Sequence, residues 1–174
     1  TVLDITKHAV KTVMEVLGPN DRLSIVKYSD NAQVVTPLSF MTDAGKAKVK
    51  FALEAMHTEG CTNIWDGILK GMETLRTRPE DTANRMASVM LLTDGQPNRE
   101  PPEGHIPALR KYLDSYPQFS CTINTYGFGY NLNSELLDEI ANEMNGSYAF
   151  IPDSGFVGTI FVNSISNVIA TAAT

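Results

Sequence analysis

The sequence is poor in the features that mark secreted disulfide scaffolds, membrane proteins and nucleic-acid binders. Its 174 residues include only two cysteines, Cys61 and Cys121, which argues against a disulfide framework and favours a reducing, cytoplasmic setting. No apolar run approaches the roughly 18 residues that a membrane-spanning helix needs, so we expect no membrane insertion. Basic residues are in deficit and the net charge is −6. Such a surface repels phosphate backbones and argues against nucleic acid as a partner.

Residue patterns of common catalytic and cofactor sites are also missing. The histidines His8, His57 and His105 are scattered and lack the ligand spacing of a zinc site. No serine lies in a Gly-x-Ser-x-Gly elbow. Residues 127–129 begin like a dinucleotide-binding fingerprint, but Leu132 stands where its third glycine would be. None of these patterns therefore identifies a zinc, dinucleotide or serine-hydrolase site.

What the sequence does contain is a regular alternation of helix and strand patterns. Hydrophobic residues make up 43% of the chain and charged residues 20%, and this length suits one globular domain over residues 1–174. The turn between residues 22–28 and 33–40 is short, so these strands should form an antiparallel hairpin, with Pro37 at a sheet edge. Apolar spacing predicts strands at 22–28, 33–40, 89–92, 120–127 and 147–151, and helices whose apolar stripes run over 10–17, 49–56, 64–75, 106–115 and 133–145 and from Val157. Thr42 or Asp43 is expected to cap the helix that carries the stripe at 49–56.

Repeated strand–helix units predict an α/β fold. We expect a doubly wound, mostly parallel sheet with one antiparallel edge strand and helices on both faces. The chain opens on a helix pattern, with no strand before it.

The most informative segment is residues 86–98, MASVMLLTDGQPN. Its apolar run is too short for a helix and predicts a strand buried on both faces. Asp94 follows directly after this strand, where open α/β sheets place their ligand sites. The alternative interpretation is an ordinary exit from the strand, because Asp-Gly is a favoured turn pair.

A second segment, residues 60–63, lies just before a predicted helix. Thr62 or Asn63 is well placed to cap that helix. A helix N-terminus also suits an anionic ligand, and a threonine hydroxyl there could instead coordinate a hard cation such as magnesium. Trp65 is interpreted as a half-buried helix residue, with an exposed partner contact as the alternative.

Together these segments resemble a known family. Residues 59–67, EGCTNIWDG, resemble the second signature loop of von Willebrand factor type A domains, and residues 91–95, LLTDG, resemble the third. The order of the loops, their spacing and the strand–helix pattern agree over essentially the whole chain. The resemblance implies a Rossmann-like fold and a metal-ion-dependent adhesion site (MIDAS) at one edge of the sheet.

In that family the threonine and the aspartate of these loops contribute to a bound magnesium, which implies Thr62 and Asp94 here. An acidic side chain of a protein partner completes the metal site, and no chemistry is performed. The remaining ligands come from an Asp-x-Ser-x-Ser motif after the first strand, and this motif is absent from the sequence. Residues 1–17 resemble the helix that follows it, so we expect the first strand and its loop upstream of Thr1.

Two consequences follow from the absence of the Asp-x-Ser-x-Ser motif and of the strand before it. One hydroxyl and one carboxylate are too few to hold magnesium well, so magnesium, manganese or calcium is expected only when the upstream motif is present. The absent strand is central in the family's sheet, and its loss should leave a gap with unpaired backbone groups.

We therefore predict a protein-interaction module of the von Willebrand factor A type, acting through Thr62, Asp94 and the flanking loops. The long, proline-rich loop after Asp94 is expected to border the same surface. Two alternatives remain: a metal-dependent α/β hydrolase or phosphotransferase that uses Asp94, and a structural scaffold whose metal site has been lost.

Overall fold

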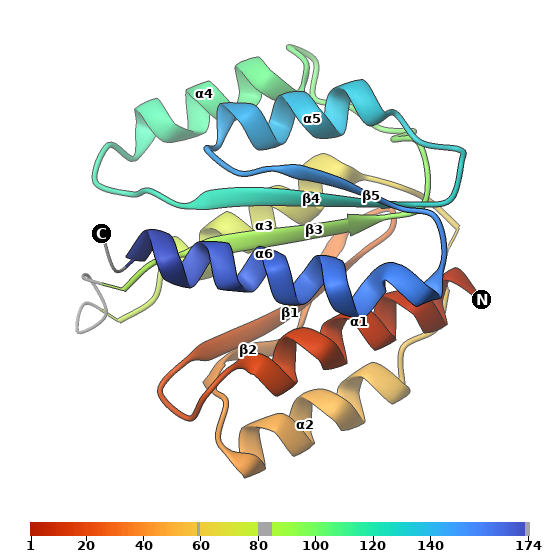
Figure 1. Cartoon of the computed structure of the whole chain (residues 1–174). Helices are drawn as coiled ribbons and strands as arrows, with labels where there is room; N and C mark the ends of the chain where they lie inside the picture. The colour runs from red at the N-terminus through yellow and green to blue at the C-terminus, as the bar shows by residue number, and fades with distance from the viewer. Residues whose placement is uncertain (59, 80–84, 173–174) are drawn as a thin grey trace.

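The computed structural model describes residues 1–58, 60–79 and 85–172, with side chains as far as Ser164. It is an α/β structure in which the strands lie between two layers of helices (Figure 1). None of the described helices combines the length and the apolarity that crossing a membrane requires. In chain order the elements are α1 (Val2–Val16), β1 (Arg22–Tyr28), β2 (Ala32–Phe40), α2 (Asp43–Glu54), α3 (Ile64–Arg76), β3 (Ser88–Thr93), α4 (His105–Ser115), β4 (Thr122–Phe128), α5 (Ser134–Glu143), β5 (Tyr148–Ile151), the short 3-10 helix η2 (Ser154–Phe156) and α6 (Val157–Ala172).

The described strands form two hydrogen-bonded groups. β1 and β2 make the predicted antiparallel hairpin, which pairs Arg22 with Phe40 at one end and Tyr28 with Ala32 at the other. β3, β4 and β5 make a parallel sheet in that order, with β4 in the middle. The predicted α/β class, the mostly parallel pairing and the antiparallel edge strand are confirmed.

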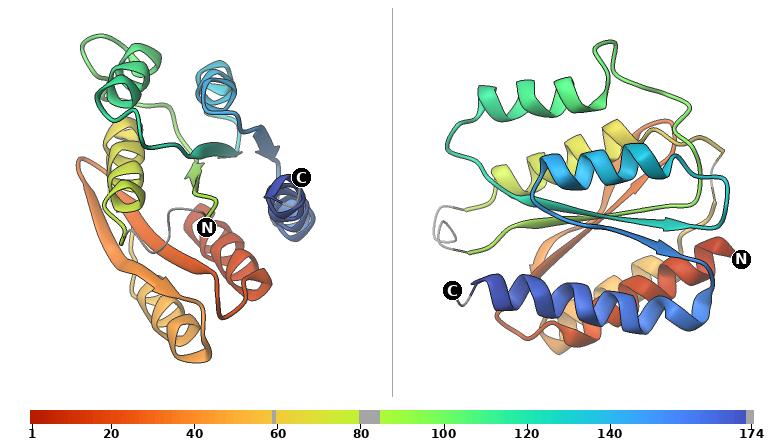
Figure 2. Two further views of the ribbon diagram at one scale, coloured as in Figure 1. Left: turned by 90° about the vertical axis from the view of Figure 1, so that its left-hand side faces the viewer. Right: turned by 45° about the horizontal axis from the view of Figure 1, so that its top comes forward.

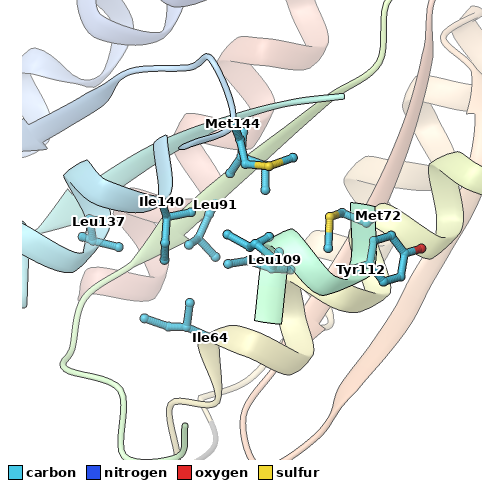
Figure 3. Packing of buried hydrophobic residues seen from close by; sticks show 10 residues of the cluster. Ile64, Met72, Leu91, Leu109, Tyr112, Leu137, Ile140 and Met144 are labelled. Carbon is cyan, nitrogen blue, oxygen red and sulfur yellow. The ribbon is translucent and has the colours of Figure 1, made fainter. Parts of the chain in front are cut away.

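Helices cover both faces, as their amphipathic patterns predict. On one face α3, α4 and α5 pack on β3 and β4 around a cluster of buried side chains that includes Ile64, Leu91, Leu109 and Ile140 (Figure 3). On the other face α1 and α6 lie side by side beneath the parallel sheet (Figure 2). α2 packs beside α1 against the hairpin, and the hydroxyl of Thr42 caps it by accepting from Gly45 N.

The predicted gap in the sheet lies between β1 and β3. These strands flank a groove of about 590 Å³ instead of pairing with each other. The groove is lined on one side by α1, through Thr6 and Val10, and on the other by α3, through Gly67 and Gly71. The hairpin and the parallel sheet are therefore joined mainly by the helices that pack across this division.

The groove explains one prediction that was wrong. β3 was expected to be buried on both faces, yet of its residues only Leu91 and Thr93 are buried. β4 is the strand that is buried along almost its whole length. β3 is less buried because one of its edges faces the groove, whereas β4 has a neighbouring strand on each side.

The end of α5 is fixed by close backbone contact with β4. Asn145 follows the helix with a left-handed φ of 56°, and Gly146 N donates to Ala141 O at 2.8 Å, an arrangement that closes many helices. A Cβ on Gly146 would lie 1.9 Å from Ile123 O. Only glycine lets α5 approach β4 this closely.

We predict that Gly146→Ala lowers the free energy of unfolding by about 3 kcal/mol, because the added methyl group forces α5 away from β4. Urea denaturation measures the change. Gly158→Ala is the matched control, since no atom lies within 4 Å of a Cβ there; in a helix it should change stability by no more than about 1 kcal/mol. Equal stability of the two variants would contradict the close packing.

Candidate functional site

The two residues singled out in the sequence both lie at the carboxyl edge of the strands. Asp94 follows β3 and is exposed, and Thr62 precedes α3 and is half-buried. Both line the groove between β1 and β3. A Cβ added to Gly95 would lie 3.4 Å from Thr62 Oγ1. The threonine loop and the Asp-Gly turn are therefore adjacent.

The Thr62 side chain does not cap α3. Of the two candidates, Asn63 is the residue that caps α3, because its Oδ1 accepts from Asp66 N at 3.1 Å. Asp66 lies in the first turn and its carboxylate accepts from Ala32 N at 2.5 Å. The positive end of α3 is therefore balanced by the chain's own side chains, and the predicted anion site there gains no support.

The loop after Asp94 is fastened to the threonine loop by Asn98. Its side-chain Oδ1 accepts from Thr62 N at 3.1 Å, and its backbone N donates to Thr62 O at 3.2 Å. Asn98 therefore binds both backbone polar groups of Thr62. This pair of hydrogen bonds ties the backbone of the threonine loop to the loop that follows Asp94.

The turn between β1 and β2 joins the same cluster of loops. Asn63 N donates to Ser29 O at 2.9 Å, and the Asn63 side chain donates to Asp30 O at 3.0 Å. Arg99 pairs with the Asp30 carboxylate at 2.8 Å, with both side chains about half exposed. An exposed ion pair adds little stability by itself, but it neutralises a carboxylate near the site.

Two neighbouring groups remain protonated. Hydrogen bonding to Asp30 is the main reason that the pKa of the Cys61 thiol lies above its usual value; a raised pKa is the opposite of what an activated cysteine nucleophile needs. Burial raises the pKa of Tyr28 to about 12. The Tyr28 hydroxyl donates to Leu92 O at 2.9 Å, across the groove between β1 and β3.

The donors at this edge fit part of a hard-cation site. A threonine hydroxyl and a carboxylate are ligands that magnesium prefers, but magnesium takes about six oxygens in all. Within the described part of the chain, no three histidine, cysteine, aspartate or glutamate side chains gather as a metal cluster. Thr62 and Asp94 could therefore contribute to a cation site without completing one.

Sequence reasoning missed Asn98, Asp30 and Arg99. Their roles depend on contacts between loops that lie 36 residues apart for Thr62 and Asn98, and no local pattern marks such contacts. Burial confirms the interpretation of Trp65, which is half-buried against the core. Cys121 is half-buried beside the same cluster. Glu59, the first residue of the threonine motif, lies outside the described residues.

Comparison with known proteins identifies the same family that the two sequence motifs resemble. The family profile described as von Willebrand factor type A domain matches residues 2–162. Inter-alpha-trypsin inhibitor heavy chain H3 of Mus musculus is 30% identical over 150 residues, which cover 81% of this chain and 16% of that protein. The chain spans a third or less of the length of the curated relatives that it matches.

Solved structures agree on the fold. A von Willebrand factor type A protein from Catenulispora acidiphila superposes with a TM-score of 0.79 at 21% identity, covering 91% of this chain and 36% of that one. Proximal thread matrix protein 1 from the mussel byssus, in a structure with a zinc-occupied MIDAS motif, gives a TM-score of 0.70 at 20% identity, covering 94% and 42%.

We predict that Asn98→Ala exposes the Thr62 amide to solvent. Losing the side-chain acceptor removes one hydrogen bond, worth about 1 kcal/mol, so the Thr62 N–H should exchange about fivefold faster in NMR hydrogen-exchange measurements. Asn98→Asp keeps an acceptor oxygen and should retain the slow exchange, and Gln96→Ala on the same loop should leave it unchanged. Equal exchange in Asn98→Ala and the parent chain would refute this fastening role.

Proposed function

The chain belongs to the von Willebrand factor type A domain family, and from this premise we propose that it is a protein-interaction module that binds its partner at the carboxyl edge of its sheet. The proposed contact surface consists of Thr62, Asp94 and the loops fastened around them. The proposal rests on the position of Gly95 beside Thr62, since a Cβ added to Gly95 would lie 3.4 Å from Thr62 Oγ1. The two loops whose residues form the cation site of the family are therefore adjacent.

We infer that Thr62 and Asp94 hold a divalent cation together with ligands from an Asp-x-Ser-x-Ser segment ahead of Thr1. When bound, the cation supplies the positive charge that a partner's carboxylate coordinates. The zinc at the corresponding motif of the mussel protein supports a cation at this position. Magnesium or manganese matches the hard oxygen donors of this chain better than zinc does.

The chain's own groups prepare this surface in two ways. Asn98 fixes the backbone of Thr62, so the hydroxyl does not have to be ordered when a ligand binds. Arg99 neutralises Asp30, which lowers the repulsion that an acidic partner would meet on a protein of net charge −6. Arg99 therefore favours an acidic partner residue at this edge.

Because this chain corresponds to only part of its relatives, we limit the proposal to binding. A metal-dependent α/β hydrolase or phosphotransferase that uses Asp94 remains the alternative. It needs a nucleophile or a second carboxylate beside Asp94, and the raised pKa of the Cys61 thiol does not favour that side chain as the nucleophile.

We predict that residues 1–174 bind Mg²⁺ weakly, with a Kd of about 1 mM or above, because they supply fewer than the about six oxygens of a full site. Isothermal titration calorimetry measures the affinity. Extending the chain upstream with a strand and an Asp-x-Ser-x-Ser loop should tighten binding at least about tenfold, or about 1.4 kcal/mol.

The site residues are tested in the extended chain. Asp94→Asn should abolish the gain in Mg²⁺ affinity, whereas Asp153→Asn, a carboxylate in the loop before η2, should retain it. Undiminished binding by Asp94→Asn would place the cation elsewhere. A failure of the extension to improve binding in the parent chain would favour the scaffold alternative, in which the metal site has been lost.

A further inference from the structure

The loop that follows β3 is anchored at its far end by a buried histidine. Every residue from Asp94 to Gly104 is exposed or half-buried. His105, the first residue of α4, is only 4% exposed. Asn98, in the middle of the loop, binds the backbone of Thr62. Burial of His105 therefore fixes the end of the loop, and Asn98 connects the same loop to the proposed binding surface.

The surroundings of His105 favour the neutral imidazole ring. Its Nε2 is buried without a hydrogen-bond partner among the described residues. A neutral ring carries one N–H, whereas a protonated ring carries an N–H on both nitrogens. A buried N–H without an acceptor is unfavourable, so a protonated His105 has to move to reach water.

The start of α4 gives a second reason for neutrality. The N-cap residue Gly104 makes no side-chain hydrogen bond, and the first turn of α4 contains no acidic residue. The N-terminus of a helix carries partial positive charge, and at this helix no side chain of the first turn offsets it. A positively charged ring at position 105 is therefore opposed by the field of its own helix as well as by burial.

Burial outweighs the acidic charge in the loop. It lowers the pKa of His105 below the usual value, and the Glu100 carboxylate opposes this with a smaller effect. His105 is therefore neutral at pH 7. Because the unfolded chain takes up the proton more readily than the folded chain, the free energy of unfolding falls as the pH drops below about 6.5.

Charged groups on the elements packed against α4 have other partners or lie at the surface. β3 and β4 contain no charged residue. On α5, Glu139 and Glu143 line a surface pocket together with α4, and Arg110 pairs with Glu143 at 2.7 Å. At the start of α3, the Asp66 carboxylate accepts from a backbone N–H of β2. These groups leave burial and Glu100 as the causes that act on His105.

We propose that His105 is an acid-sensitive anchor for the loop that fastens Thr62. At neutral pH the uncharged ring is buried and keeps the loop in place, so that Asn98 binds Thr62. When the ring takes up a proton it moves into solvent, the end of the loop is released, and the hydrogen bonds between Asn98 and Thr62 are lost. Control of partner binding by this release rests on the proposed function, whereas the release itself needs neither a cation nor a partner and is tested without them.

NMR titration of the three histidine rings tests the protonation of His105 directly. His8 and His57 are exposed, and single His→Gln variants assign the three signals. We expect the His105 ring to titrate with a midpoint below the ordinary histidine value of about 6.5. A midpoint at or above that value would overturn the anchor, because the buried position would then not resist the proton.

Hydrogen exchange at two amides tests the release of the loop. The Thr62 N–H reports on the bond to Asn98, and the Thr125 N–H, which donates to Ser147 O at 3.0 Å, reports on the parallel sheet. Protection factors correct for the intrinsic effect of pH. From pH 7 to pH 5 we expect the protection of Thr62 to fall by at least about fivefold, and at pH 5 to remain at least about tenfold below that of Thr125. Equal protection of both amides at pH 5 would mean global unfolding and would overturn a local release.

Two substitutions assign the effect to His105. His57→Gln is the matched control and should retain the fall in Thr62 protection, whereas His105→Gln should reduce it to less than twofold. His105→Phe keeps an aromatic ring that cannot be protonated and should behave like His105→Gln. Each variant is compared only with itself at the two pH values, so a change in stability at neutral pH does not affect the result. A full fall in protection in both His105 variants would assign the pH dependence to another group.

Discussion

The division of the sheet between β1 and β3 is the constraint on which the rest of the structure depends. Backbone pairing holds the hairpin together and, separately, holds β3, β4 and β5 together. The two units are connected by apolar packing of α3 on one face and α1 on the other, and the groove runs between these helices. Apolar packing is not directional, so it brings the units together without the precise pairing that strand hydrogen bonds would add.

At the carboxyl edge of the strands, hydrogen bonds connect the hairpin, α3 and β3 across this division. Asn63 ties the start of α3 to the hairpin turn through Ser29 and Asp30, and Asn98 ties the loop after β3 to Thr62. Tyr28 adds a direct bridge from β1 to Leu92 on β3. The threonine loop and the turn at Asp94 are consequently held close together, although the hairpin and β3 belong to separate sheets. The same loops that form the proposed binding surface thus help to hold the two halves of the domain in place.

The proposed cation site lies at one end of the groove between β1 and β3. Asp94 and Thr62 line the carboxyl end of the groove, and Arg22 lines its amino end. A ligand held by Thr62 and Asp94 would therefore lie at the carboxyl end of the groove, between the hairpin and the parallel sheet.

Local chemistry in the sequence determined most of the elements and their class. The strand predicted at residues 22–28 is β1 as found, and Thr42 caps α2 because a short side-chain oxygen next to a helix start satisfies a free N–H whatever the rest of the chain does. The Asp-Gly turn after β3 and the threonine before α3 were also identifiable, since each lies beside the element that positions it. Only the tertiary structure decided that Asn98 holds Thr62, that Arg99 neutralises Asp30, and that β4 rather than β3 is buried along its length. These outcomes depend on which loops and strands meet in space, and contacts between residues far apart in the chain leave no periodic or local trace in the sequence.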